Sequence, residues 1–194
     1  MLKDLVRKNR SYRRFDESHQ ISMEELIEIS SLGRLVPSTA NSQALKFMLI
    51  NTPEENNAIF NTIGWAAKLK DWNGPKEGER PTAYIILLCD LAIGSNHPTD
   101  DGIIAQTMLL GAVELGYGGC MLGNVKRDEL ARILKIDTEK YKIDLVIALG
   151  KPNEEIILED ITPNKDTSYY RDDQDIHHVP KRSLEELIVY KSHS

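Results

Sequence analysis

A cluster of basic residues close to the N-terminus is the first feature that could carry chemistry. Five of the eight residues from position 7 to position 14 are basic, and no acidic residue follows before Asp16. Arginine presents a rigid fork of donors that matches phosphate oxygens, and a neighbouring serine hydroxyl adds a short donor. In a chain of net charge −6 this segment indicates a bound anion, with the alternative that it is a solvated basic helix end. The candidate donors are Arg10, Ser11, Arg13 and Arg14.

A second, uncharged segment with the sequence PSTANSQ runs from Pro37 to Gln43. It lies between a predicted helix end and a predicted strand start, where loops present site residues on a rigid scaffold. Asn41 and Gln43 offer paired donors and acceptors without charge. A neutral heteroaromatic ring with alternating N–H, C=O and N atoms requires such partners. The segment therefore indicates a ring-binding loop, and the alternative is an ordinary polar turn.

Two shorter features could extend these sites. Lys181 and Arg182 precede a predicted helix, where a cation is mildly unfavourable. That placement is easier to explain if an anion lies between, although a solvated pair is the alternative. Leu122 and Gly123 follow an apolar stretch, and the glycine permits close backbone approach to a flat ligand. The alternative there is an ordinary glycine turn.

Several other chemistries find no support in the sequence. The chain has no GxGxxG, GxxxxGK[ST] or GxSxG motif, so it lacks the dinucleotide, P-loop and nucleophile-elbow signatures. His177 and His178 are adjacent and cannot place both rings on one face, so we predict no metal site there. Cys89 and Cys120 lie inside apolar runs and are predicted to be buried thiols of a reducing compartment. Asp100 is predicted to cap the longest helix.

The composition is that of a globular protein. The 194 residues are 41% hydrophobic and 28% charged, with a pI of about 5.4. This acidic balance argues against nucleic acid or an anionic membrane as the main partner. The N-terminus has no apolar signal region, and the apolar stretch 102–119 is interrupted by polar residues and glycines. We therefore expect a cytoplasmic protein.

Periodicity and capping signals predict alternating helices and strands. We expect helices at residues 2–8, 22–36, 53–60, 100–115, 126–134 and 183–189, and strands at 47–50, 83–89 and 143–149. A helical turn is expected at 66–69, a loop at 72–81, a turn at 116–119 and mostly irregular chain at 153–179. The order of elements indicates an α+β fold. The helix at 100–115 is apolar nearly all round, which predicts enclosure by other elements or a second subunit.

Taken together, these segments resemble the nitroreductase family of FMN-dependent oxidoreductases. The resemblance rests on RSYRRF (residues 10–15), PSTANSQ (37–43), KFMLI (46–50), IDLVIALGKP (143–152) and VPKRSLEEL (179–187). It implies one domain over residues 1–194, with a central, mainly antiparallel sheet flanked by helices. It also implies that residues 153–194 form an arm on a partner subunit, and that a homodimer holds two FMN sites at its interface.

The resemblance also implies roles for individual residues. Arg10, Ser11 and Arg13 would hold the FMN phosphate and ribityl chain, joined by Lys181 or Arg182. Ser38, Asn41 and Gln43 would line the flavin, with Leu122 and Gly123 beside the ring face, and Arg14, Pro37 and Thr39 complete the cofactor-binding set. No protein residue is expected to be catalytic, because the flavin performs the chemistry. Electrons would pass from NADH or NADPH through flavin N5 to a small oxidised substrate, such as a nitroaromatic or a quinone, in a ping-pong sequence.

The substrate stays open. Ala44 and Leu45 stand where the family commonly has proline and an aromatic residue. The insertion that shapes the substrate pocket in longer members is reduced to about residues 64–81, with Trp65, Lys68 and Trp72. Flavin or quinone reduction and dehalogenation are alternative uses of the same fold. A flavin store or sensor with little turnover is another alternative. In a third, no cofactor binds and the basic cluster pairs with the acidic residues 172–175.

Overall fold

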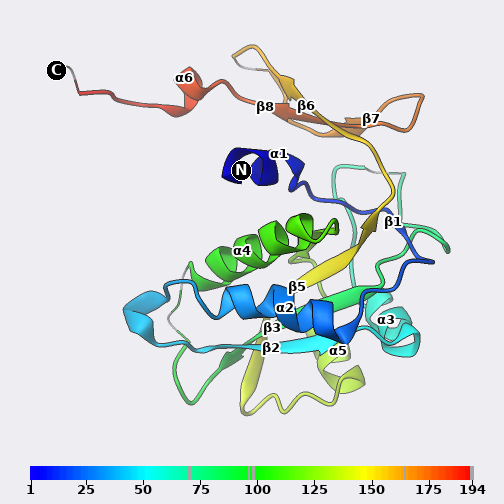
Figure 1. Ribbon diagram of the computed structural model, residues 1–194, viewed down its shortest axis with the longest axis vertical. Coiled ribbons are helices and arrows are strands. Elements are labelled where there is room, and N and C mark those ends of the chain that lie inside the picture. Colours follow the sequence, from blue (N-terminus) through cyan, green and yellow to red (C-terminus); the bar gives the residue numbers. More distant parts are fainter. Residues whose placement is uncertain (70, 96, 98, 164, 193–194) are drawn as a thin grey trace. The chain divides into compact units, whose positions relative to one another are not determined.

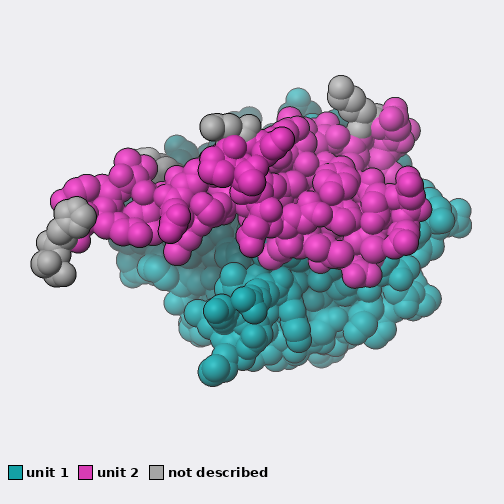
Figure 2. All heavy atoms as spheres, turned by 90° about the horizontal axis from the view of Figure 1, so that it is seen from above, with its two compact units in different colours: residues 1–65, 74–153 teal, residues 66–73, 154–194 magenta. Residues whose placement is uncertain are grey.

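The computed structural model describes residues 1–69, 71–95, 97, 99–163 and 165–192. Contacts within the chain define two compact units, which Figure 2 distinguishes by colour. The first unit comprises Met1–Trp65 and Gly74–Asn153, and the second comprises Ala66–Asn73 and Glu154–Ser194. The single domain over residues 1–194, with residues 153–194 as an arm on a partner subunit, stays a prediction.

The first unit is built on a five-stranded sheet in which every strand pair is antiparallel. Its elements are α1 (Leu2–Lys8), β1 (Phe15–Asp16), α2 (Met23–Gly33), a 3₁₀ turn (Thr39–Asn41), β2 (Leu45–Ile50), α3 (Pro53–Phe60), β3 (Ala83–Asp90), α4 (Asp100–Glu114), β4 (Gly118–Leu122), α5 (Arg127–Ile133) and β5 (Tyr141–Pro152). The long strand β5 pairs with β1, β3 and β4, and β2 adds to the other edge of β3. The predicted α+β class with a mainly antiparallel sheet is confirmed.

The hydrophobic core lies between the sheet and the helices α2 and α4, which run side by side in Figure 1. Every residue of β3 is buried, so this strand is covered on both faces. Gly33 faces the Met108 side chain, and Gly111 faces the Leu32 side chain. These two glycines let α2 and α4 approach closely, because a Cβ atom at either position would overlap its neighbour.

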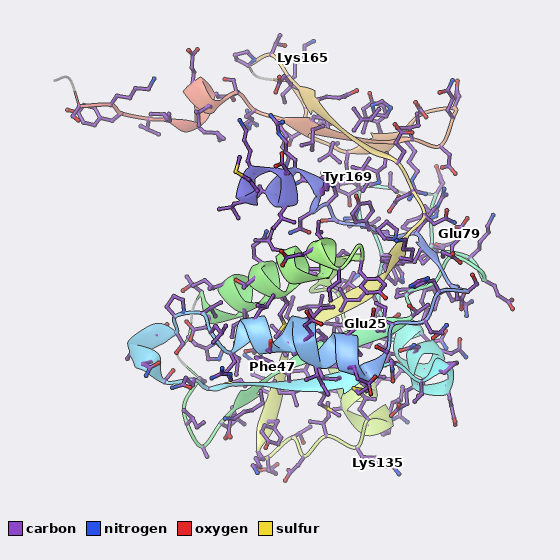
Figure 3. The ribbon with its side chains drawn as sticks, in the orientation of Figure 1. Glu25, Phe47, Glu79, Lys135, Lys165 and Tyr169 are labelled. Carbon is purple, nitrogen blue, oxygen red and sulfur yellow. The ribbon has the colours of Figure 1, made fainter. Side chains whose placement is uncertain are left out.

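The helix starts in this unit follow from local capping chemistry. Ser22 and Glu25 form the predicted capping box at the start of α2, where Glu25 lies on the first turn (Figure 3). Thr52 accepts a hydrogen bond from the backbone of Glu55, and Pro53 occupies the first position of α3. None of the helices among the described residues has the length and hydropathy needed to span a membrane.

The glycine-rich stretch after α4 was predicted to be a turn, and this prediction is wrong beyond residue 117. Gly118–Leu122 forms strand β4, which pairs with β5 in the register Gly119↔Leu149. A Cβ atom on Gly119 would overlap the carbonyl oxygen of Ala148, and one on Gly118 would press on the Tyr12 ring. Close packing within a sheet, and not a chain reversal, explains these glycines.

The second unit has a small sheet that the sequence pattern did not reveal. It contains β6 (Ile156–Asp160), β7 (Tyr170–Arg171), β8 (His177–Lys181) and the short helix α6 (Leu184–Leu187). β8 pairs with β6 in parallel and with β7 antiparallel. Most of residues 153–179 lie outside these strands, as expected, but the expectation did not include the sheet. β7 and β8 carry few apolar residues, and β6 pairs with β8 across a long connection, so no local periodicity marks this sheet.

Candidate functional site

The basic segment lies beside strand β4. Ser11 forms a parallel bridge with Gly119, and the backbone N–H of Tyr12 donates to the carbonyl oxygen of Gly119 at 3.1 Å. The Tyr12 ring packs over Gly118. This bridge holds the basic segment against β4, the strand that ends at Leu122. Gly119 lies three residues before Leu122 in β4, about 10 Å along the strand. The predicted subsites at residues 10–13 and at Leu122–Gly123 are therefore both attached to this strand.

The three candidate arginines of this segment, Arg10, Arg13 and Arg14, have different surroundings. Arg10 donates from Nη2 to the carbonyl oxygen of Val6 at 2.9 Å, while its buried Nε has no partner among the described residues. Arg13 donates from Nη1 to the carbonyl oxygen of Ser11 at 3.2 Å. Arg14 lies 3.5 Å from the Glu79 carboxylate, with both side chains largely buried. The charge of Arg14 is therefore offset inside the unit by Glu79, whereas Ser11 is exposed.

The loop from Pro37 to Gln43 has an unusual backbone. Ala40, Asn41 and Gln43 have φ angles of 50°, 53° and 53°, in the left-handed region that side-chain-bearing residues rarely adopt. Gln43 donates its backbone N–H to the Ser38 hydroxyl, and its side-chain amide lies 3.4 Å from two oxygens of Asn41. Pro37, Asn41 and Gln43 are exposed. Strain of this kind persists only where surrounding contacts enforce it, and it clusters at ligand sites.

Those contacts come from the first residue of α4. Both carboxylate oxygens of Asp100 accept from the backbone N–H of Thr39, at 3.0 and 3.1 Å, and Oδ1 also accepts from the Thr39 hydroxyl at 2.8 Å. Asp100 is only 2% exposed. The prediction that Asp100 caps its own helix is wrong, because Thr99 is the N-cap and the carboxylate serves the loop. Sequence reasoning missed that Asp100, an acidic residue at the first helical position, is buried and binds the loop.

The third predicted subsite lies where β4 ends. Leu122 is buried, whereas Gly123 is exposed and a Cβ atom on it would meet nothing within 4 Å. The carbonyl oxygen of Gly123 accepts from Arg127 Nη1 at 3.4 Å, and the carbonyl oxygen of Asn124 accepts from the backbone of Gly64 at 2.9 Å. The end of β4 is thus held by two neighbouring segments and leaves the face of Gly123 open.

The structure brings only some of the predicted residues together within the first unit. Ser11 pairs with Gly119 of strand β4, Leu122 ends that strand and Gly123 follows it, and Gly119 packs on Leu109 of α4. The loop around Thr39 is bound to the start of the same helix, at Asp100. Nine residues of helix, about 13 Å of axis, separate these two attachment points. The loop and the basic segment are therefore distinct half-sites on one scaffold.

The remaining predicted residues lie in the second unit. Lys181 ends β8 opposite Asp160 and is exposed, and Arg182 forms an ion pair with Glu186. The acidic residues that one alternative paired with the basic cluster have partners within their own unit. Asp172 binds His178 Nε2 at 3.0 Å, and Asp175 lies 3.8 Å from Arg171.

Comparison with known proteins gives the family. The model of the Nitroreductase family matches residues 6–83 and 95–151, and the chain therefore belongs to this family. Its relative YdgI of Bacillus subtilis (strain 168), provisionally named an NAD(P)H nitroreductase, is 24% identical over 185 residues, which cover 78% of this chain and 88% of YdgI.

Solved structures show the same fold. An FMN-dependent nitroreductase from Clostridium difficile R20291 matches with a TM-score of 0.61 and 20% identity, over 78% of this chain and 87% of that chain. A structure from a Desulfovibrio desulfuricans subspecies, provisionally assigned as a nitroreductase in complex with FMN, matches with a TM-score of 0.65 and 22% identity. That match covers 100% of this chain and 98% of the other. The nitroreductase fold of this protein is thus established independently of the motifs.

Proposed function

We propose that this protein binds FMN and is an NAD(P)H-dependent oxidoreductase. The observation that carries the proposal is the Ser11–Gly119 bridge, which places the basic segment and the open end of β4 on one surface feature. Membership of the nitroreductase family and the FMN named for two structural relatives support it. Fold alone does not define an activity, so the residues must also suit the cofactor.

The donor set suits a phosphate ester and a polar ring. Arg10 retains a buried Nε without a partner among the described residues, and the exposed Ser11 hydroxyl adds a neutral donor. We assign the phosphate and ribityl chain to Arg10, Ser11 and Arg13, and leave Arg14 to its pair with Glu79. The strained loop supplies uncharged groups for the ring from Ser38, Asn41 and Gln43, while Pro37 and Thr39 shape that loop. Lys181 and Arg182 stay predictions.

Bound flavin would accept and release the electrons, so the chain itself needs no nucleophile or acid–base pair. The positive charges of Arg10 and Arg13 bind and orient the cofactor's anionic end. Asn41 and Gln43 hydrogen-bond to polar edges and fix the orientation of the ring, and Leu122 excludes water from one side. Because Gly123 has no side chain, a flat reactant can approach the exposed end of β4.

We further propose that the working form is a homodimer. In one chain the two half-sites lie at different levels of α4, and a two-fold axis would let the loop of one protomer meet the basic segment of its partner. Exposed apolar side chains offer material for such an interface: Leu2 and Val6 on α1 are 69% and 45% exposed. Leu184 and Leu187 on α6 are 71% and 62% exposed. Sedimentation analysis would give the oligomeric state directly.

A cytoplasmic location and a small oxidised substrate complete the proposal. Cys89 and Cys120 are buried and not joined in a disulfide, as in proteins of a reducing compartment. We propose that the donor and the acceptor react in turn at one exposed face. Double-reciprocal plots of initial rate against donor concentration, at several acceptor concentrations, should therefore be parallel. Nitroaromatics and quinones are the first acceptors to try, because both are flat and the space at Gly123 is open.

The deciding experiment uses the purified full-length chain without oxygen. It should be yellow, or take up added FMN stoichiometrically, and its flavin absorbance should bleach when NADH or NADPH is added. A protein that neither retains nor takes up FMN would refute the cofactor assignment. A yellow protein that neither nicotinamide bleaches would instead be a flavin store or sensor, and only the oxidoreductase assignment would fail.

A further inference from the structure

A group of three buried side chains in the first unit is not used by the proposed flavin site. Cys89 is the second-last residue of strand β3, His97 lies in the connection that leads to α4, and Asp144 lies on β5. One ligand atom of each residue, a sulfur, a ring nitrogen and a carboxylate oxygen, lies within 4.8 Å of the other two. Cys89 is 0% exposed, and the side chains of His97 and Asp144 are 8% and 7% exposed.

Three polar atoms of this group lack the hydrogen-bond partners that burial normally requires. Neither ring nitrogen of His97 has a hydrogen-bond partner among the described residues, and Asp144 Oδ2 is also without one. The two residues approach to 3.3 Å between His97 Nε2 and Asp144 Oδ2 without hydrogen-bond geometry. Buried polar groups without partners are rare and call for an unseen ligand or ion.

From this geometry we propose that Cys89, His97 and Asp144 bind a divalent transition-metal ion, with zinc as the ion that fits best. Sulfur, imidazole nitrogen and carboxylate oxygen are all zinc ligands, and calcium or magnesium would not take the sulfur. The Nε2–Oδ2 separation of 3.3 Å equals the edge of about 3.3 Å between nitrogen and oxygen ligands of tetrahedral zinc.

The sulfur has to move slightly to complete the site. A sulfur–nitrogen edge in tetrahedral zinc is about 3.6 Å, whereas the three atoms are within 4.8 Å. At present Cys89 Sγ donates to the carbonyl oxygen of Gly94 at 3.1 Å. On binding, the thiol proton would leave to solvent, and the carbonyl oxygen of Gly94 or a water molecule would be available as the fourth ligand.

The surrounding charges accept a cation in this position. Lys142 contacts the other carboxylate oxygen of Asp144, Oδ1, at 3.1 Å and leaves Oδ2 available. Arg127 donates from Nη2 to the backbone carbonyl oxygen of Asp144 and not to its carboxylate. A thiolate and a carboxylate would neutralise the two positive charges of the ion, so the occupied site would carry no net buried charge.

The site would have a structural role. It would tie β3, β5 and the connection before α4 into one point, and the carbonyl oxygen of His97 accepts from the backbone N–H of Asp100 at 3.2 Å. Asp100 in turn holds Thr39. The ion would therefore stabilise the start of α4 independently of any flavin chemistry.

The test measures metal content and thermal stability of the full-length protein, prepared with chelator and then loaded with zinc and dialysed. The wild type should retain one zinc per chain and unfold at a higher temperature than the metal-free form, because a ligand that binds only the folded state stabilises it. Cys89→Ala and His97→Ala should each weaken zinc binding by more than the roughly 10- to 100-fold caused by losing an outer-shell partner.

Cys120→Ala removes the other buried thiol and should retain zinc like the wild type. Cobalt provides a second readout: a sulfur-to-cobalt absorption in difference spectra should be present in the wild type and Cys120→Ala, and absent in Cys89→Ala. The proposal would be overturned by a wild type without stoichiometric zinc. It would also be overturned if Cys89→Ala and His97→Ala retained as much zinc as the wild type. If one variant fails to fold by circular dichroism, the other and Asp144→Asn decide the outcome.

Discussion

The carboxylate of Asp100 holds Thr39 through both the backbone N–H and the side-chain hydroxyl of the threonine. Sixty-one residues separate the two in the sequence. This contact ties the left-handed loop at residues 40–43 to the start of α4. The loop that we propose for ring binding is therefore positioned by a buried acid on a rigid helix, as precise binding sites require.

Replacing Thr39 by valine should destabilise the protein by about 1.5–3 kcal/mol, because a hydrogen bond to a buried charged group is lost. FMN retention should fall as well, since the loop loses one of its fixed contacts. Thr107→Val is the matched control, because the exposed hydroxyl of Thr107 donates to the Ile103 carbonyl oxygen of its own helix. Urea unfolding compares the stabilities of the two variants, and equal free energies of unfolding would contradict this account.

Replacing Arg10 by alanine should weaken FMN binding by about 10- to 150-fold, which corresponds to about 1.5–3 kcal/mol for a charge-assisted hydrogen bond. Arg132→Ala removes an exposed arginine from α5 and should leave the affinity unchanged. Fluorescence titration of flavin into the cofactor-free protein gives both dissociation constants. Unchanged affinity in the Arg10 variant would remove this residue from the phosphate site.

Gly119 in β4 and Gly123 just after its end should respond differently to replacement by alanine. At Gly119 the added Cβ atom overlaps the backbone oxygen of Ala148, so Gly119→Ala should cost about 1–3 kcal/mol of stability. At Gly123 the space is open, so stability should change by no more than about 0.5 kcal/mol. If Gly123→Ala nevertheless weakens FMN binding, that position lies against the cofactor; an unchanged affinity would argue against the predicted contact.

The hydrogen bond from Tyr117 to Glu25 predicts sensitivity to acid. Tyr117 donates to Oε1 at 2.7 Å, and this bond, with those from Ser22, lowers the pKa of Glu25 below its ordinary value of 4.5. A lowered folded-state pKa contributes stability above pH 4.5 that disappears as the pH falls through the folded value. Tyr117→Phe should reduce this acid-dependent loss, whereas Tyr190→Phe, at a 78% exposed residue, should not. Acid titrations followed by circular dichroism would test the difference.

A histidine between two acids predicts the opposite pH dependence in the second unit. Hydrogen bonds to Asp172, at 3.0 Å from Nε2, and to Glu159, at 2.6 Å from Nδ1, raise the pKa of His178 above 6.5. Its contribution to stability is therefore complete below pH 6.5 and is lost as the pH rises through the folded value. His178→Gln should remove this alkaline loss.

The two tryptophans make this measurement possible. Trp72 belongs to the second unit and stacks with Arg171 at 4.6 Å, whereas Trp65 belongs to the first. In a Trp65→Phe background, the fluorescence of Trp72 should report unfolding of the second unit by urea. Identical pH profiles with histidine and with glutamine at position 178 would contradict the assigned role.

Local patterns in the sequence were sufficient for the helices of the first unit. The capping box at Ser22, the proline at residue 53 and the apolar run of β3 each specify a neighbouring conformation through contacts a few residues away. Residue type alone also drew attention to the basic segment and the amide loop, and the motifs supplied the family. Those local signals could not predict which of these segments lie close together in the folded chain.

Tertiary structure decided the features that depend on distant partners. Gly118 and Gly119 were predicted to form a turn because glycine commonly marks one. Glycine is required there because Tyr12 and β5 leave no room for a Cβ atom. The sheet of the second unit depends on pairing between β6 and β8, which no local periodicity encodes. Asp100 was assigned to its own helix but bonds to Thr39, because burial gives its carboxylate no water and the loop supplies the donors.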